Sequence, residues 1–266
     1  MADDLLLYRV MSFEQFVDTV ASQRMYLTQL QRWDDTHEAE TLRQLVRQFF
    51  DSSPDAARFS AQIKDQLLGV IHRSLYGQSW TILEESDAMW RIYSPDKMGI
   101  RITVRQPDVL ARIQQTNFIK SEDTELYCGK VIYISAEEAW NQVQETLKRD
   151  GDSTPKTFAN LCFFKRKQFS HEQEYRFAAF VPPADFFQRI QIDPAKPVEE
   201  GRVLNGIREL AFPPVYYYSI QPAMITQVTL DPRAPDWFVE TVQNFFARYA
   251  NPNLAQKSTL YSPPKV

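Results

Sequence analysis

Hydrophobic and polar positions alternate with different periods along the 266-residue chain. The run from Leu5 to Val10 is apolar enough to predict a buried strand, and 99–104 alternates Ile and Val with polar residues as a half-exposed strand does. After Ser12, a helical stripe of four apolar residues and the S-x-x-Q spacing of a capping box predict a helix from 13 to about 22.

The same patterns predict further elements. Strands are expected at 25–30, 78–83, 126–135, 174–181, and near 187–192, 208–212 and 225–230; helices are expected at 38–50, 56–75, 86–93, 108–115, 135–148 and 235–249. Because no regular βαβ rhythm appears, we expect one α+β domain over 1–250. Residues 38–76 form a possible helical insertion, and 251–266 read as a flexible C-terminal tail.

Composition narrows the classes of function. With only 7 Gly, the chain has no GxGxxG or GxxxxGK[ST] phosphate loop. A net charge of −4 argues against broad, charge-driven binding of nucleic acid. Two Cys and three His without CxxC or HxxxH spacing do not predict a metal site. No apolar run reaches the ~20 residues of a membrane span, so we expect a cytoplasmic protein without a membrane partner.

The first candidate for chemistry is the stretch Glu172-Gln173-Glu174-Tyr175-Arg176. If Glu174 begins a strand, Glu172 and Glu174 point to the same side. Two such carboxylates repel each other unless a cation lies between them, and Arg176 on the same face is suited to neutralise them. The pattern leaves two interpretations open: a ligand site or a solvated, charged strand edge.

Arg9, next to Tyr8, is the second candidate, since an arginine in an apolar strand is costly unless it has a partner. One interpretation pairs Arg9 with Glu172 or Glu174 as a structural ion pair. The other presents its planar guanidinium to a phosphate.

Weaker candidates surround these two. Asp35 and Glu38 suit a helix cap after Trp33. A polar and aromatic set lies around the expected strand and short helix: Ser79, Thr81, Trp90 and Tyr93. The two aromatic residues of this set suit a core as well as a ligand platform. The basic run 165–167 suits either a phosphate or a solvated loop.

Together these stretches resemble a bacterial family of domains of unknown function. Its members open with Leu-Tyr-[Lys/Arg], carry an Asn-Asp-Pro-x-Glu turn, and later show M-W-x-x-Y-x-x-x-x-x-G and W-x-x-E-x-E-x-R. The matching stretches here are 7–9, 34–38, 89–99 and 169–176. Thr36 replaces the proline of the turn, and Phe169 replaces the tryptophan.

More distantly, the order of motifs resembles ADP-ribosyltransferases, which place an Arg or His first, a Ser/Thr or Tyr element next, and a Glu or E-x-E late. This resemblance implies a split, mixed or antiparallel sheet with peripheral helices and NAD as co-substrate. It also implies that Glu174 holds the ribose and that Glu172 orients or deprotonates the acceptor. Arg9 would then grip the pyrophosphate or ribose, and Tyr93 or Trp90 would stack on nicotinamide; the remaining expected cofactor-binding residues are Tyr8, Ser79, Thr81 and Arg176.

Two functions therefore remain. The first is an NAD-dependent mono-ADP-ribosyltransferase, a bacterial toxin or anti-phage effector with a nucleic-acid or protein acceptor and an inhibitory antitoxin partner. The second is a non-catalytic binding module in which Arg9 and the two glutamates form a structural ion-pair network.

Overall fold

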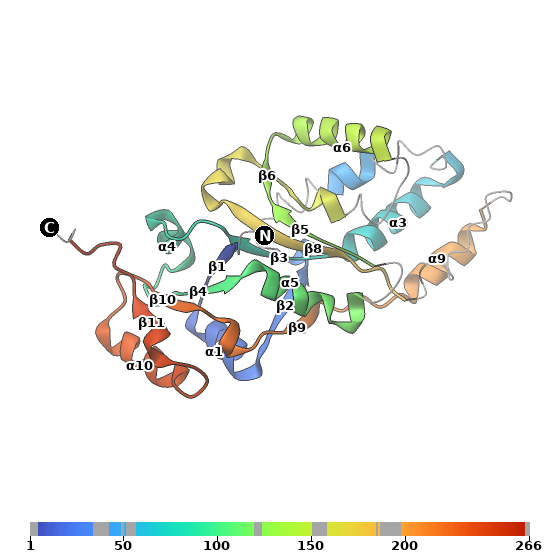
Figure 1. Ribbon diagram of the computed structural model, residues 1–266. Coiled ribbons are helices and arrows are strands. Elements are labelled where there is room, and N and C mark those ends of the chain that lie inside the picture. Colours follow the sequence, from blue (N-terminus) through green and yellow to red (C-terminus); the bar gives the residue numbers. More distant parts are fainter. Residues whose placement is uncertain are drawn as a thin grey trace.

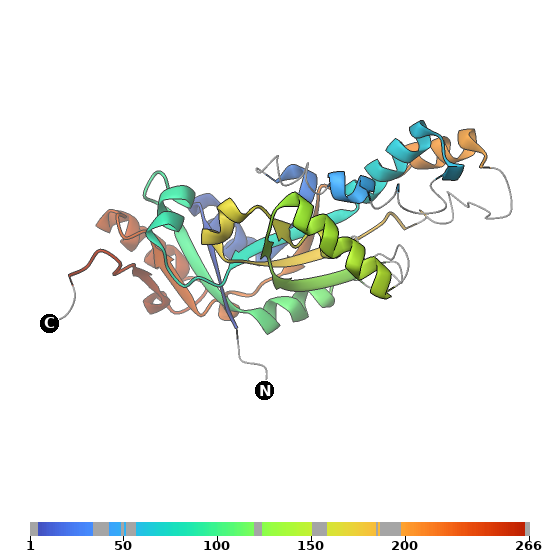
Figure 2. The same ribbon diagram turned by 90° about the horizontal axis from the view of Figure 1, so that it is seen from above.

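Nine strands form one mostly antiparallel sheet in the computed structural model of the protein (Figures 1 and 2). The structure describes residues 5–33, 43–48, 51, 57–119, 124–150, 159–184, 186 and 198–263. These strands are β1 (Leu6–Met11), β2 (Arg24–Gln29), β3 (Leu75–Thr81), β4 (Ile100–Arg105), β5 (Glu125–Lys130), β8 (Glu174–Phe180), β9 (Val215–Ser219), β10 (Gln227–Leu230) and β11 (Ala255–Lys257). Two short strands, β6 (Ile132–Tyr133) and β7 (Phe164–Lys165), pair separately. The expected α+β class is confirmed.

The sheet divides at β3. One edge of β3 pairs with β8 along its whole length, from Leu75 to Thr81. The other edge pairs with β2 at Tyr76 and Gly77 and with β1 only at Thr81. Among the described strands, nothing pairs with this edge between those two contacts, so β1 and β2 diverge there. This divergence opens the sheet at its centre.

Helices cover both faces of the sheet (Figure 2). They are α1 (Phe13–Ser22), α3 (Ala61–Arg73), α4 (Asp87–Tyr93), α5 (Gln106–Gln114), α6 (Ala136–Asp150), α9 (Glu200–Arg208) and α10 (Asp236–Phe246). Buried side chains of α1, α5 and α10 pack on one face, including Phe16, Val109 and Phe246. Residues of α3 and α6 belong to a second cluster, which contains Leu68 and Ala139. Burial of both apolar faces holds the sheet between the two helical layers.

Local sequence signals predicted several of these elements well. Ser12 caps α1 with the expected capping box. The Ser12 side chain accepts from the backbone N–H of Gln15, and the Gln15 side chain accepts from the backbone N–H of Ser12. The strand predicted at 208–212 is wrong, because 200–208 form α9, whose buried Val203 and Ile207 pack against α3. The strand predicted at 187–192 lies outside the described residues.

The expected flexible tail is also wrong for its described part. Residues 255–257 form β11, which pairs in parallel with β10, and Ala255 is fully buried. Further on, Ser258 donates a short hydrogen bond to Glu85, and the Tyr261 hydroxyl contacts Asp87. The pattern missed these contacts because only one apolar residue of the strand enters the core, while backbone hydrogen bonds supply the rest.

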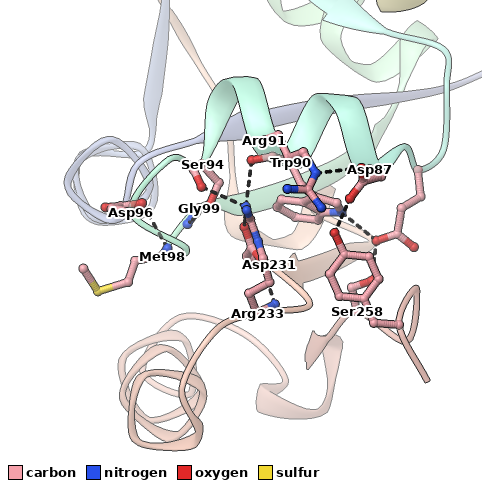
Figure 3. Close-up of polar contacts among 12 residues, drawn as sticks. Asp87, Trp90, Arg91, Ser94, Asp96, Met98, Gly99, Asp231, Arg233 and Ser258 are labelled. Atoms are coloured by element: carbon pink, nitrogen blue, oxygen red, sulfur yellow. Dashed lines mark hydrogen bonds and ion pairs between the residues drawn. The ribbon is translucent and has the colours of Figure 1, made fainter. Parts of the chain in front are cut away.

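A charged pair holds α4 to the end of β10 (Figure 3). Arg233 lies 2.6 Å from the fully buried carboxylate of Asp231 and donates to the carbonyls of Trp90 and Ser94, both at 3.0 Å. These carbonyls lie in the last turn of α4 and at its C-cap, and the Trp90 carbonyl also accepts from the backbone N–H of Ser94. We call Asp231 and Arg233 the α4 anchor.

Candidate functional site

A cavity of about 260 Å³ lies where the sheet divides. It is lined by β1, β3, α4 and the segment before β8, with one residue of α1: Tyr8, Arg9, Val10, Gln15, Ser79, Trp80, Thr81, Met89, Tyr93, Glu172 and Glu174. The first strand and the late glutamates, more than 160 residues apart in sequence, therefore face one space. Of the nine residues predicted for the site, seven line this cavity.

Arg9 bridges the gap in the sheet. It is half-buried, and its guanidinium donates a short hydrogen bond to the backbone carbonyl of Ser79 on β3. Burial lowers the pKa of Arg9 from its usual value. Arg9 forms no ion pair with any carboxylate among the described residues. Of the two interpretations left open for Arg9, the structural ion pair with Glu172 or Glu174 is therefore not the one observed.

The two glutamates instead meet two other cations, and we call Lys165, Glu172, Glu174 and Arg176 the cavity cluster. The ammonium of Lys165 lies 2.7 Å from a carboxylate oxygen of Glu172 and also contacts Glu174. Arg176 donates to the other oxygen of Glu174 at 2.8 Å. All four side chains are at most 8% exposed. The prediction that Arg176 neutralises the acidic pair is confirmed for Glu174.

The route by which the glutamates converge differs from the prediction. Glu172 does not lie on the strand; it ends a 3-10 helix, η4 (Lys167–Glu172), and Glu174 begins β8. Gln173 between them has a left-handed backbone, with φ of 43°. The Thr81 hydroxyl donates to the carbonyl of Glu172 at 2.6 Å and holds this turn against β3. A turn, rather than strand alternation, brings the carboxylates together.

The surroundings of the two carboxyl groups shift their pKa values in opposite directions. Burial, together with the neighbouring Glu174, raises the pKa of Glu172 above its usual value despite Lys165. Burial also opposes ionisation of Glu174, but Arg176, Glu172 and Lys165 outweigh it and lower the pKa of Glu174. Glu174 is therefore the more readily ionised member of the pair, and Glu172 is the member that holds a proton more readily.

Polar and aromatic candidates complete the wall. Tyr93 of α4 donates from its hydroxyl to Glu172 at 3.0 Å and is 43% exposed. Tyr8 is largely buried, and burial raises the pKa of its hydroxyl. Ser79 reaches the cavity while its carbonyl receives Arg9. Tyr93 is the aromatic ring that remains accessible to a ligand.

Two predicted residues lie elsewhere. Trp90 is 1% exposed and donates from its indole to Glu85 at 2.8 Å, so it belongs to the core beneath α4 (Figure 3). Tyr93, one turn further along α4, lies at the edge of this buried side and is 43% exposed. Arg176 also does not line the cavity; it lies behind Glu174 and beside the Trp33 ring, 4.6 Å away. Asp35 and Glu38 lie outside the described residues.

The basic run does not form an open phosphate site. Lys165 points into the cavity cluster, and Lys167 pairs with Glu138 at 3.0 Å. The guanidinium of Arg166 lies 5.0 Å from the centre of the Phe169 ring. Sequence reasoning missed Lys165 as the partner of both glutamates, because a charge run reads as a solvated loop.

Neither a metal cluster nor a membrane-spanning helix occurs in the described part of the chain. No group of three or more His, Cys, Asp and Glu is placed to hold a metal ion there. None of the helices described above combines the length and apolar character needed to cross a bilayer.

Comparison with known families places part of this site in context. A domain described as "Protein of unknown function (DUF2971)" matches residues 89–177, which confirms the resemblance to a family of unknown function. The match includes Tyr93 and the whole cavity cluster, and it excludes Arg9 on β1. No curated protein and no solved structure matches the chain.

Proposed function

We propose that the protein is an NAD-dependent mono-ADP-ribosyltransferase whose reaction takes place in the cavity between β1 and β3. The observation that carries this proposal is the convergence of Arg9, Tyr93, Glu172 and Glu174 on one space. Arginine, an aromatic ring and an anionic carboxylate suit a phosphate, a flat base and a developing positive charge, respectively. The resemblance in motif order supports the same assignment.

The cavity fits one half of the co-substrate. Its volume of about 260 Å³ lies just below the about 300–1,000 Å³ of typical small-molecule sites. It therefore suits the nicotinamide riboside portion, with Tyr93 beside the ring and the glutamates beside the ribose. Arg9, at the border of the cavity, is placed for the adjoining phosphates.

Each residue has a defined task. NAD supplies a glycosidic bond whose electron pair leaves with neutral nicotinamide, while the acceptor forms a new bond to the same ribose carbon. Glu174, kept anionic by Arg176 and Lys165, stabilises the positive charge that develops on the ribose. Glu172, whose pKa is raised, takes the proton that the acceptor loses. Tyr93 orients the carboxylate of Glu172 through its hydroxyl.

A second function, the non-catalytic binding module, has one observation in its favour. The glutamates already have cationic partners, since Lys165 contacts both and Arg176 contacts Glu174. Buried networks of this kind also occur as purely structural features. In such a module the cavity would bind a ligand without breaking a bond in it.

The decisive experiment incubates the full chain with NAD labelled in its adenylate half and with RNA, DNA or lysate protein. We expect nicotinamide release and label transfer to one acceptor class. Glu172→Gln should abolish transfer, because glutamine cannot accept the proton. Glu138→Gln, which alters an exposed glutamate paired with Lys167, is the matched control and should leave transfer unchanged.

The outcome separates the two functions. NAD that binds but stays intact with every acceptor class would favour the binding module. Transfer that persists in Glu172→Gln would remove this residue from the reaction. Growth arrest on expression of the wild type, but not of the Glu172→Gln variant, would support the toxin or anti-phage role.

A further inference from the structure

A second cavity adjoins the first on the other side of Arg9. It has a volume of about 220 Å³ and lies between β1, β2 and α1. Arg9 and Gln15 line both cavities. The two cavities therefore adjoin at Arg9 and Gln15, and we call the pair of cavities the groove.

The lining of the second cavity suits a nucleoside. Met11 and Met25 are each only 4% exposed and form an apolar floor. Tyr26 presents a ring that is 36% exposed and is held edge-on by Tyr217, 6.0 Å away. A flat base gains free energy by stacking on such a ring, and thioethers adapt to the shape of the bound group.

Carboxylates at the rim determine what this half accepts. Asp18 and Glu14 on α1 both line the cavity, and Asp18 is contacted only loosely by Arg24, at 3.9 Å. Carboxylates accept hydrogen bonds from hydroxyl groups and repel phosphates. A bound ribose is therefore favoured at this rim, and phosphate groups are favoured at Arg9.

Arg9 has unused capacity for those phosphates. A guanidinium carries five N–H donors, and the hydrogen bond from Arg9 to the carbonyl of Ser79 engages one of its nitrogens. No carboxylate of the described chain pairs with it. A fork fixed by one backbone contact and open on its other side suits bidentate binding of a diphosphate.

We infer that the second cavity is the adenosine subsite of the groove, with the base on Tyr26, the ribose hydroxyls at Asp18 and the diphosphate at Arg9. The inference rests on the proposed function in naming NAD as the ligand. It sets the direction of the dinucleotide: adenosine lies beside α1, and the bond to be broken lies beside Glu172 and Glu174.

The test is titration calorimetry of the full chain with ADP, which carries the adenosine and the diphosphate but has nothing to transfer. The wild type is expected to bind ADP. Tyr26→Ala should weaken ADP binding by about tenfold through loss of stacking. Asp18→Asn should weaken it several-fold, and neither change should alter binding of nicotinamide mononucleotide. Tyr249→Ala, at a tyrosine of similar exposure, 38%, that does not line the groove, is the matched control.

The result distinguishes this subsite from the proposed reaction. ADP that fails to bind, or that binds equally to wild type, Tyr26→Ala and Asp18→Asn, overturns the subsite. If NAD is cleaved with an unchanged KM in Tyr26→Ala, the transferase stands and the subsite falls. If ADP binding depends on Tyr26 while NAD stays intact, the subsite stands and the transferase falls.

Discussion

The α4 helix lies between two charged clusters that differ in what their carboxylates face. On one side, Asp231 of the α4 anchor is fully buried, and its partner Arg233 is also bonded to two backbone carbonyls (Figure 3). On the other side, Glu172 and Glu174 of the cavity cluster are nearly as buried, yet they line a cavity. The charged groups of the α4 anchor contact backbone carbonyls, whereas the two glutamates of the cavity cluster line a cavity.

This difference distinguishes a structural ion pair from a candidate reactive one. In the α4 anchor Asp231 holds Arg233, and Arg233 in turn bonds the carbonyls of Trp90 and Ser94, so the charges serve the fold. In the cavity cluster two carboxylates lie close together, and their pKa values move in opposite directions. Such divergence is typical of groups that share acid–base work. Four predictions test the comparison.

Glu174→Gln should have the largest effect on the cleavage of NAD, the step in which positive charge develops on the ribose. Removal of the anionic charge should lower the rate of NAD cleavage by about two to three orders of magnitude, as loss of one preorganised stabilising group does. Arg176 would also lose its charge partner, so the rate is compared per folded molecule after thermal unfolding has been measured. A rate within tenfold of the wild type would contradict the role of Glu174.

Asp231→Asn should affect stability instead. It leaves Arg233 without its carboxylate in a largely buried position, which should cost about 2–3 kcal/mol of unfolding free energy. We expect NAD turnover per folded molecule to change by less than about threefold, because no atom of the α4 anchor lines the cavity. Urea titration gives the first quantity. A large loss of turnover without loss of stability would erase the distinction between the clusters.

The pH dependence of stability should have one sign for Asp231 and Glu174 and the opposite sign for Glu172. Asp231 and Glu174 have lowered pKa values, so their contributions are present above the unfolded values of about 3.9 and 4.3 and are lost as pH falls through the folded ones. Glu172 has a raised pKa, so its contribution is full below about 4.3 and is lost as pH rises through its folded value.

The variant Glu172→Gln isolates the contribution of Glu172 to the pH dependence of stability. Relative to the wild type, its melting temperature should rise as the pH increases from about 4.3 to the folded pKa of Glu172 and then level off, because glutamine does not titrate. Melting curves of both proteins across this range measure the difference. A difference that stays constant with pH would show that the pKa of Glu172 is not raised.

Tyr93→Phe should have the smallest effect. It removes the hydroxyl that donates to Glu172 at 3.0 Å and keeps the ring. Loss of one such hydrogen bond, worth about 1 kcal/mol, should reduce turnover about fivefold with little change in melting temperature. Tyr93→Leu is the sharper companion, because it also removes the ring and should raise KM further. Equal kinetics for Phe and Leu would argue against a ligand beside this ring.

Local signals in the sequence predicted most elements of the fold. Period and capping residues predicted α1 and the strand of Arg9 to within one residue at most ends. The failures lie where local pattern and tertiary contact disagree. α9 follows a Pro-rich stretch whose pattern predicts strands and loops. β11 depends on backbone pairing with β10, which the hydrophobic pattern does not reveal.

The site was predictable in its residues but not in its pairing. An arginine in an apolar strand and a late E-x-E are unusual enough to stand out alone. Lys165, the partner of both glutamates, lies in an ordinary run of charged residues and does not stand out in the sequence. The left-handed backbone of Gln173, which brings the glutamates together, is likewise not indicated by the sequence. The division of the sheet at β3, which creates the groove, depends on which strands pair over long distances.

The central claim is that Arg9 and the two glutamates form one binding groove for NAD. Calorimetric titration of NAD into the folded wild type and into Arg9→Gln tests it most directly. We predict one site per chain in the wild type and an affinity at least about tenfold weaker in Arg9→Gln, through loss of the charge-assisted contact. No binding by the folded wild type at millimolar NAD, or equal affinity in the two proteins, would contradict the account.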